Sequence, residues 1–338
     1  MSTLLERWKE RARLVPQRLV LAEAADERVL GAARILAEQA VARVTLVTPD
    51  QGGLDAGASQ VLTRAGVALV PSGAPEEIAG TSAALGEARG ARLSAAERER
   101  LARDPLFQAA TRVRDGRADC LVAGASRTTA DVLRAALWLI GLAPGASLVS
   151  SFFVMSVPAR GGEAARTLVF ADCGVVPDPD ARQLAEIGIA AAEHFERLVG
   201  EGARVAFLSY SSRGSASHAR VDKVREAVEQ ARVARPDLIL DGELQADAAL
   251  DPEVARRKSP GSPVAGRANV LVFPDLDSGN IGYKLVQRLA GAAAYGPILM
   301  GLRAQANDLS RGCSVEDVVQ VSLIACTLAA RPSERGRT

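Results

Sequence analysis

Near the start of the chain, apolar residues alternate between short runs and a helical repeat. Residues 18–22 and 43–47 are apolar runs of the length that buried strands have. Between them, residues 26–40 carry apolar side chains at helical spacing. A strand, a helix and a second strand at this spacing predict a parallel βαβ unit. An amphipathic helix is predicted to precede this unit over residues 1–16.

The alternation continues, less regularly, as far as Ile140. Residues 51–80 predict loops around one weak strand at 66–70, and residues 81–117 predict helices rich in alanine and arginine. Residues 118–125 are a clear buried strand, and a helix is predicted to follow it through Ile140.

The pattern changes near Ser147. Residues 147–157 and 166–171 predict two strands of a hairpin that turns at Gly161 and Gly162. Helices and strands then alternate again. The predicted helices span residues 180–199, 219–233 and 281–293, the predicted strands span 205–210, 237–241, 270–273 and 296–302, and residues 251–267 predict a loop. The pattern as a whole predicts the α/β fold class, arranged most simply as two α/β domains with a cleft between them.

Chemically active side chains gather most densely in residues 307–317, Asn-Asp-Leu-Ser-Arg-Gly-Cys-Ser-Val-Glu-Asp. This segment lies between the predicted strand at 296–302 and a helical repeat that begins near Val318. In open α/β sheets, ligands gather where strands end and helices begin, and a helix N-terminus attracts anions. A structural interpretation competes with this one, because Ser314 and Asp317 have the spacing of a capping box. The residues alone favour the capping hypothesis, since short motifs often match by chance.

Charge and composition narrow the function classes. A formal net charge of +1 gives no global field that would attract nucleic acid or an anionic membrane. No apolar run reaches the roughly 20 residues that span a bilayer, and the first residues lack the basic and apolar regions of a secretion signal. The four cysteines are far apart and form no CxxC pair, which argues against both a zinc site and a disulfide framework. We therefore expect a cytoplasmic protein with reduced thiols.

Five segments of the chain resemble, in order, the signature motifs of the phosphate acetyltransferase (phosphotransacetylase) family. They are residues 130–134 (ADVLR), 150–155 (SSFFVM), 172–179 (DCGVVPDP), 273–289 (FPDLDSGNIGYKLVQRL) and 307–314 (NDLSRGCS), the last of them preceded by GPILMGL at 296–302. The resemblance covers roughly residues 17–330, and five separated motifs in the same order form a specific signal.

The resemblance implies both a fold and a reaction. The fold would consist of two three-layer α/β domains with a cleft between them, similar to that of isocitrate and isopropylmalate dehydrogenases. Domain one would comprise residues 1–147 plus 298–338, and domain two would comprise residues 148–297. The reaction would be reversible, with acetyl-CoA and phosphate giving coenzyme A and acetyl phosphate by direct transfer in a ternary complex. The family resemblance also implies a homodimer with these small-molecule substrates and with no cofactor or metal.

Acyl transfer from a phosphate to a thiol needs a base, donors for the acyl oxygen and positive charge for the departing phosphate. By resemblance, Asp317 would be the base, Ser310 would donate to the acyl oxygen or the phosphate, and Arg311 would grip the phosphate. Ordinary pKa values of about 8.5 for a thiol and about 3.9 for Asp make free proton transfer uphill by roughly 6 kcal/mol. Burial of Asp317 or an arginine beside the thiol would narrow this gap. Glu316 is the alternative base.

Further binding residues are predicted by the resemblance and by their positions at helix starts. Arg28, Arg89 and Arg134 would bind the phosphates of coenzyme A or the phosphoryl group of the substrate. Arg92 competes with Arg89 for the place of the family's arginine, and a solvated helix face is an equally open interpretation of this segment. Cys313 would form a wall of the pocket rather than act as a nucleophile, because no histidine lies near it in the sequence. The other candidates are polar residues in the same kinds of motif: Ser126, Thr128, Asn280 and Asn307.

Three other functions remain open at this point. Val176 stands where the family often has asparagine, so a phosphate butyryltransferase or propionyltransferase is an alternative. A nicotinamide-dependent dehydrogenase would share the implied fold, but it needs a carboxylate cluster for a metal and gives residues 307–314 no role. A non-catalytic acetyl-CoA-binding module would bind acetyl-CoA without turning over acetyl phosphate.

Overall fold

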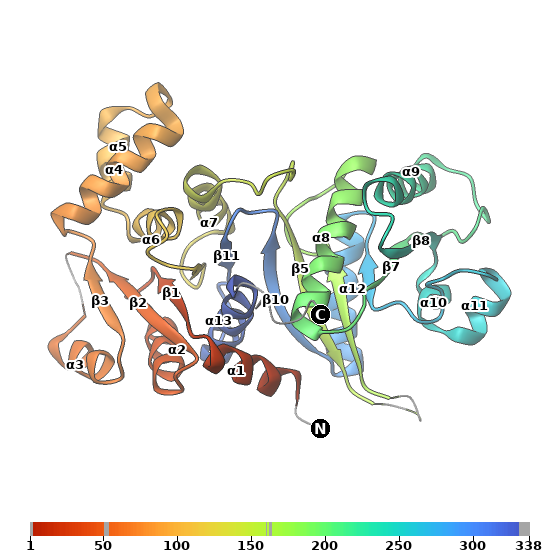
Figure 1. Ribbon diagram of the computed structural model, residues 1–338, viewed down its shortest axis with the longest axis horizontal. Coiled ribbons are helices and arrows are strands. Elements are labelled where there is room, and N and C mark those ends of the chain that lie inside the picture. Colours follow the sequence, from red (N-terminus) through yellow and green to blue (C-terminus); the bar gives the residue numbers. More distant parts are fainter. Residues whose placement is uncertain (1–2, 51–53, 160, 162–163, 331–338) are drawn as a thin grey trace, which may run out of the picture. The chain divides into compact units, whose positions relative to one another are not determined.

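The computed structural model describes residues 3–50, 54–159, 161 and 164–330, and their arrangement is drawn in Figure 1. The chain divides into two compact units, of which unit 1 comprises Met1–Pro144 and Leu302–Thr338 and unit 2 comprises Gly145–Gly301. Among the described residues, no helix is both long enough and apolar enough to cross a membrane.

Unit 1 is built on a five-stranded sheet in the order β11-β4-β1-β2-β3, in which every neighbouring pair is parallel. Its strands are β1 (Gln17–Leu21), β2 (Ala42–Thr48), β3 (Ala68–Pro71), β4 (Cys120–Ala123) and β11 (Gln305–Asp308). The parallel pairing of β1 with β2 confirms the predicted βαβ unit. The strand order reverses beside β1, because β2 and β3 extend the sheet on one side and β4 and β11 on the other. Open parallel sheets bind ligands at such a reversal, outside the carboxyl ends of the strands.

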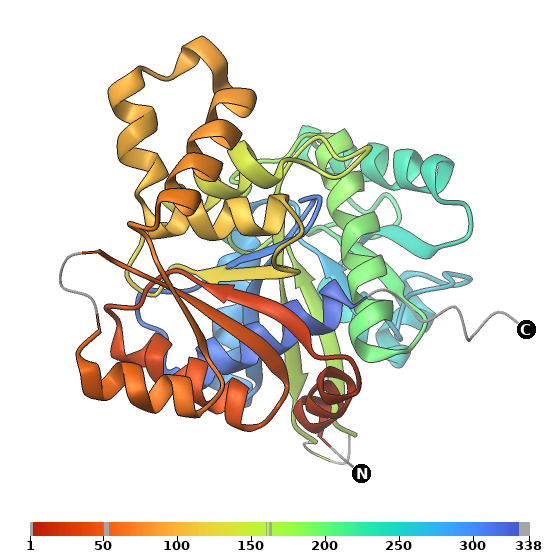
Figure 2. The same cartoon turned by 60° about the vertical axis from the view of Figure 1, so that its left-hand side comes forward.

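Helices cover both faces of this sheet (Figure 2). On one face, α13 (Val315–Ala329) packs against α1 (Leu4–Leu14) and α2 (Glu27–Glu38). On the other face, α6 and α7 enclose a hydrophobic core that includes Leu85, Phe107 and Val132. The remaining helices of unit 1 are α3 (Ala56–Arg64), α4 (Pro75–Arg89), the 3-10 helix η1 (Gly90–Arg92), α5 (Ala95–Ala102), α6 (Pro105–Arg114) and α7 (Thr129–Ala135), which continues as the π-helix η2 (Ala136–Ile140).

Unit 2 has a six-stranded sheet in the order β10-β5-β6-β9-β7-β8. Its strands are β5 (Ser150–Val157), β6 (Arg166–Ala171), β7 (Arg204–Leu208), β8 (Ile239–Leu244), β9 (Val270–Val272) and β10 (Ala293–Met300). The antiparallel pairing of β5 with β6 confirms the two predicted strands of the hairpin, whereas Gly162 of its predicted turn lies outside the described residues. Strand β10 is antiparallel to β5, whereas β6, β9, β7 and β8 run parallel. The helices are α8 (Ala181–Val199), α9 (Ala219–Ala234), α10 (Ala246–Leu250), α11 (Pro252–Lys258) and α12 (Leu276–Ala290). Helices α8 and α9 pack together on one face of the sheet, and α12 lies on the other (Figure 1).

Several segments predicted as loops or turns are helical. Residues 51–80 contain α3 and the start of α4, and residues 251–267 begin with α11. Helix α12 begins at Leu276 instead of residue 281, because the Asp275 carboxylate accepts the Ser278 N–H at 2.8 Å and caps the helix. Asp, Ser, Gly and Asn suit both turns and helix starts, so composition alone did not separate the two.

The unit boundary also differs from the predicted one. We expected the chain to return to the first domain at residue 298, inside an apolar strand. All of β10 belongs to unit 2, because its residues Ala293–Met300 pair with β5 on both sides of an irregularity between Tyr295 and Ile298.

The packing around Phe207 gives a test of the fold of unit 2. A Cβ added at Gly188 in α8 would lie 2.4 Å from Cζ of Phe207, and one added at Gly242 would lie 2.9 Å from its Cβ. Because the ring is completely buried, we expect Gly188→Ala to lower the free energy of unfolding by about 1–3 kcal/mol. Gly80→Ala in α4, where the methyl meets nothing within 4 Å, should raise it by about 0.5–1 kcal/mol. Urea unfolding measures both, and stabilisation by both substitutions would contradict the packing argument.

Candidate active site

Three loops of unit 1 follow neighbouring strands at the reversal of strand order. They are residues 22–26 after β1, residues 124–128 after β4 and residues 309–314 after β11. Because parallel strands end at the same edge of a sheet, the three loops lie next to one another. These loops and the helices after them carry most of the residues predicted for the site.

The buried carboxylate of Glu23, just after β1, holds the loop that follows β4. It accepts hydrogen bonds of 2.7–3.0 Å from the four consecutive backbone N–H groups of residues 124–127. The Ser126 hydroxyl also donates to Glu23, at 2.8 Å. Successive N–H groups of this kind form an anion-binding nest, and here the protein's own carboxylate occupies it. Ser126, predicted to bind substrate, therefore contributes its hydroxyl to the support of the loop.

Arg28, in the first turn of α2, ties all three loops together. Its Nε and Nη2 donate to the Asp26 carboxylate at 3.0 and 2.7 Å. Nη2 also donates to the carbonyl of Ala125 at 2.7 Å, and Nη1 donates to the carbonyls of Arg311 and Cys313 at 2.8 Å each. These bonds use all five N–H donors that a guanidinium has. Arg28 would have to give up one of them to bind a phosphate as predicted.

The three predicted catalytic residues lie on the loop after β11 and in the first turn of α13. Ser310, Arg311 and Asp317 are all exposed. Asp317 Oδ2 accepts the backbone N–H and the hydroxyl of Ser314 at 2.8 Å each, and the Asp317 N–H donates back to the Ser314 hydroxyl at 3.2 Å. The predicted capping box is thus confirmed. The Asp317 side chain is exposed, so the structure does not show the burial that was expected for the base.

Cys313 is buried beneath the same loop. Burial raises the pKa of its thiol, an effect that the nearby Arg28 guanidinium opposes. A thiol with a raised pKa carries little thiolate at neutral pH, and the thiolate is the nucleophilic form. This environment is consistent with the prediction that Cys313 forms a wall of the pocket and does not act as a nucleophile.

Arg89 and Arg134 share one aromatic ring. The guanidinium carbon of Arg89 lies 4.4 Å from the centroid of Trp138, and that of Arg134 lies 5.7 Å from it. Arg134 also pairs with Asp131 at 2.7 Å. The indole therefore brings together two of the predicted phosphate-binding arginines, although they are far apart in the sequence. Trp138 was not predicted for the site, because in the sequence it is one of several apolar residues in a predicted helix.

The other predicted binding residues have defined structural contacts. The Thr128 hydroxyl caps α7 by accepting the N–H of Asp131 at 3.2 Å. Asn280 belongs to unit 2 and donates to the carbonyl of Cys173 at 3.0 Å. Asn307 is completely buried in β11, so its side chain cannot contact a ligand in this conformation. We do not assign Asn307 to the binding surface.

Asp308 was not predicted for the site. Its side chain is 3% exposed, Oδ2 accepts the Thr129 hydroxyl at 2.6 Å, and Oδ1 has no hydrogen-bond partner within the described part of the chain. A Cβ at Gly124 would lie 2.3 Å from Oδ1, so only glycine admits this approach. Burial raises the pKa of Asp308 to about 6, and the nearby Glu23 carboxylate acts in the same direction. No sequence signal pointed to Asp308, because β11 has the mostly polar sequence Gln-Ala-Asn-Asp.

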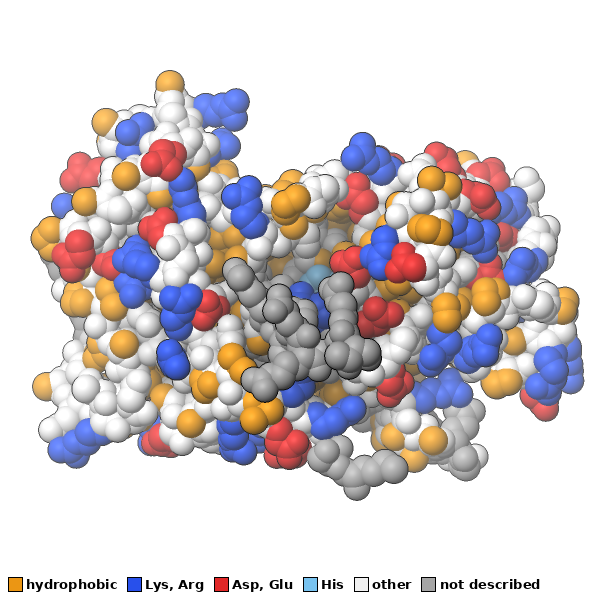
Figure 3. All heavy atoms as spheres, in the orientation of Figure 1, with side chains coloured by type: hydrophobic (Ala, Val, Ile, Leu, Met, Phe, Trp, Pro, Cys, Tyr) orange, Lys and Arg blue, Asp and Glu red, His pale blue; other side chains and the backbone are white. Residues whose placement is uncertain are grey.

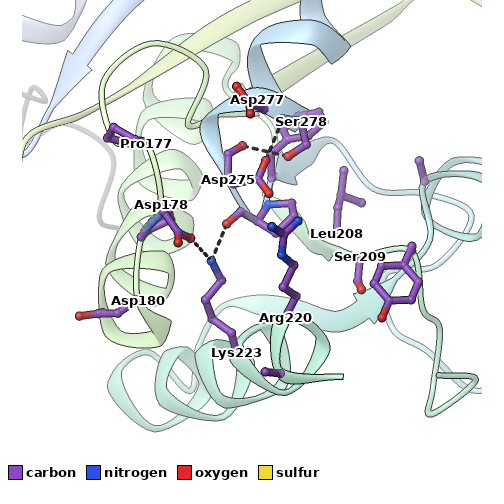
Figure 4. A pocket seen from close by; sticks show the side chains of 16 residues that line it. Pro177, Asp178, Asp180, Leu208, Ser209, Arg220, Lys223, Asp275, Asp277 and Ser278 are labelled. Atoms are coloured by element: carbon purple, nitrogen blue, oxygen red, sulfur yellow. Dashed lines mark hydrogen bonds and ion pairs between the residues drawn. The ribbon is translucent and has the colours of Figure 1, made fainter. Parts of the chain in front are cut away.

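Unit 2 has a pocket of its own, with a volume of about 960 Å³ (Figure 4). It lies where the segments at 172–179 and 273–289 meet α9, and its walls carry charges of both signs. Lys223 joins these two segments by donating to the Asp178 carboxylate at 2.7 Å and to the carbonyl of Pro274 at 3.0 Å. Arg220 from the same helix also lines the pocket. None of the residues predicted for the site lines it.

Comparisons with known proteins agree over nearly the whole chain. A family model described as Phosphate acetyl/butaryl transferase matches residues 3–326. The phosphate acetyltransferase of Paracoccus denitrificans is 47% identical over 331 residues, which cover 95% of this chain and 97% of that protein. The phosphate acetyltransferase of Acetivibrio thermocellus is 46% identical over 333 residues, covering 97% of this chain and 98% of the relative. The crystal structure of a phosphotransacetylase from Streptococcus pyogenes matches with a TM-score of 0.88 and 38% identity, covering 97% of this chain and 99% of that one.

The raised pKa of Asp308 predicts how stability depends on pH. A carboxyl whose pKa rises from 3.8 to about 6 on folding favours the folded state while it is protonated. That contribution is present below about pH 4 and is lost as the pH rises through about 6, by roughly 3 kcal/mol. Asp308→Asn cannot ionise, so its free energy of unfolding relative to wild type should increase between pH 4 and pH 7 and then level off. Denaturant unfolding across this range measures the difference, and a constant difference would contradict the assignment.

Proposed function

The chain belongs to the phosphate acetyl/butaryl transferase family, and from this we propose that it transfers an acetyl group reversibly between acetyl phosphate and coenzyme A. The observation that carries the proposal is the exposed set of Ser310, Arg311 and Asp317 on one loop and helix start. Arg28 fixes this loop at the reversal of strand order, where open sheets bind ligands. The set combines a base, a hydroxyl donor and a guanidinium, which are the groups that the reaction needs.

In the proposed step, the sulfur of coenzyme A attacks the acetyl carbonyl carbon and its proton passes to Asp317. The carbon–sulfur bond forms, the bond from carbon to the phosphate oxygen breaks, and phosphate leaves with the electron pair and takes up the proton from Asp317, which restores the base. Ser310 donates to the acyl oxygen as negative charge develops on it, and Arg311 binds the departing phosphate through two parallel hydrogen bonds. The bound substrates exclude water from Asp317, which raises its affinity for the proton. Side chains and substrates carry every bond change, so the proposed reaction uses no cofactor.

The arginine pair on Trp138 is suited to the phosphates of coenzyme A. Arg89 and Arg134 are both half-buried, and both guanidinium groups contact the indole ring of Trp138, which favours their positive charges. We assign the predicted phosphate-binding role to this pair. Arg28, whose donors are all used, we assign to positioning the loops.

We propose that the protein is a homodimer joined through α12. Of the residues in this helix, all of which the structure describes, only Gly279 is buried. Ile281, Leu285 and Leu289 are 56%, 52% and 74% exposed and recur every four residues along one stripe. A contiguous apolar stripe of this kind on a soluble protein usually marks an interaction surface. A second copy of the same stripe would cover it in an isologous contact.

A cytoplasmic location is also part of the proposal. It rests on the four cysteines, which are all free in the structure, and on the metabolic thiol that the reaction consumes. Reducing compartments keep such thiols unoxidised.

A coupled assay of coenzyme A with acetyl, propionyl and butyryl phosphate tests the function and its variants. We expect the fastest acyl-CoA formation with acetyl phosphate. Faster turnover of butyryl or propionyl phosphate would favour the alternative activity, that of a phosphate butyryltransferase or propionyltransferase, which the presence of Val176 suggested. The backbone N–H of Val176 donates to the Asp172 carboxylate at 2.9 Å. Binding of acetyl-CoA without turnover of any donor would favour the non-catalytic module, and reduction of NAD(P) by hydroxy acids would favour the dehydrogenase.

Asp317→Asn separates catalysis from capping. The amide still accepts hydrogen bonds at the N-cap, so the helix should persist, but it cannot take up the thiol proton. We expect turnover to fall by about 100- to 10,000-fold with coenzyme A binding nearly unchanged, measured by steady-state kinetics and calorimetry. Ser314→Ala is the matched control, because it breaks the capping box at a cost of about 1 kcal/mol and leaves the carboxylate. Loss of folding or of coenzyme A binding in Asp317→Asn would show that capping is the residue's main role.

Leu285→Glu tests the dimer. A charge in the middle of the apolar stripe should oppose burial against a second copy and give a monomer in analytical ultracentrifugation. Val233→Glu is the control, because Val233 is also an exposed apolar residue, 84% exposed on α9. A dimer that survives Leu285→Glu would show that the stripe is not the interface.

A further inference from the structure

We infer that Asp308 is a positioning residue for the proposed reaction, and that its ionised carboxylate holds the start of α7 against the loop that carries Ser310 and Arg311. The inference rests on the proposed function, because the reaction is what makes the relative placement of these two elements matter.

The side chain of Asp308 links two elements that carry different parts of the site. Asp308 ends β11, and the chain continues from it directly through Leu309 to Ser310. Its Oδ2 accepts the hydroxyl of Thr129 at 2.6 Å, and Thr129 is the first residue of α7, the helix that carries Arg134. The hydrogen bond therefore fixes the start of α7, and with it the arginine pair, relative to the loop after β11.

The surroundings of Asp308 leave its charge poorly compensated. Oδ1 lies against Gly124 and has no hydrogen-bond partner among the described residues. The Thr129 hydroxyl from α7 and the backbone N–H of Leu309 favour the ionised carboxylate, whereas the Glu23 carboxylate in the loop after β1 opposes its ionisation. The guanidinium of Arg28, in the first turn of α2, is fully engaged with Asp26 and with backbone carbonyls. A buried carboxylate with one unsatisfied oxygen and a neighbouring negative charge is costly to ionise, which agrees with a pKa of about 6.

The two protonation states hold α7 with different strength. A hydroxyl donates a stronger hydrogen bond to a carboxylate than to a neutral carboxylic acid. Ionisation therefore tightens the link between Thr129 and Asp308, and protonation loosens it. Turnover should rise as the pH increases through the pKa of Asp308, independently of the titration of the catalytic base.

The test is the pH dependence of kcat between pH 5 and pH 9 with saturating coenzyme A and acetyl phosphate. Wild type should show a rising limb near pH 6. Asp308→Asn should lose that limb and keep turnover at pH 8 within about tenfold of wild type, with little change in the KM for coenzyme A. A limb near pH 6 that survives in Asp308→Asn belongs to another group and overturns the inference.

Two substitutions at Thr129 provide a second, directional measurement that does not depend on how Asp308→Asn folds. Thr129→Val removes the donor that stabilises the ionised carboxylate, so the limb should move to higher pH, whereas Thr129→Ser keeps the donor and should leave the limb in place. A limb that stays in place or moves to lower pH in Thr129→Val overturns the inference. Absence of acyl transfer by wild type at every pH would instead overturn the proposed function, so the two failures are distinguishable.

Discussion

The loop and helix start after β1 hold the candidate site together. Glu23 binds four consecutive N–H groups of the loop after β4, and Arg28 binds carbonyls in both that loop and the loop after β11. Glu23 lies just after β1, beside which the order of the sheet reverses, and Arg28 lies in the first turn of α2, so a short segment reaches both neighbouring loops. Because charged groups form the strongest hydrogen bonds in proteins, these contacts can fix the three loops relative to one another.

This arrangement changes how the charged residues near the site are interpreted. A nest of N–H groups and an arginine at a helix start are both features that bind phosphate in other proteins. Here the protein fills the nest with Glu23 and satisfies every donor of Arg28 internally. The surface that remains available to anions lies instead on the exposed Arg311 and on the two arginines that share Trp138. The internal contacts make the loops rigid, and rigid loops let the exposed groups act without reorganising.

The carboxylates of Asp317 and Asp308 also differ in how far internal contacts occupy them. Asp317 caps α13 through one oxygen, Oδ2, while the side chain stays exposed to a substrate. Asp308, by contrast, is buried. Its Oδ2 accepts the Thr129 hydroxyl, and its Oδ1 has no hydrogen-bond partner among the described residues. Two acidic residues nine positions apart thus differ in burial, and only the exposed one can meet a thiol.

The sequence by itself determined the alternation of strands and helices, the parallel βαβ start, the hairpin of unit 2 and the motif at residues 307–317, because these depend on local periodicity and residue type. It also predicted the capping box, which is a local hydrogen-bond pattern. Only the tertiary structure decided that β11 lies beside β4, that Arg28 is internally satisfied and that Asn307 is buried. The partnership of Arg89 with Arg134 on Trp138 and the link from Asp308 to Thr129 likewise join residues far apart in the chain. Such contacts depend on strand order and on close approaches such as that at Gly124, which the spacing of residues along the chain does not encode.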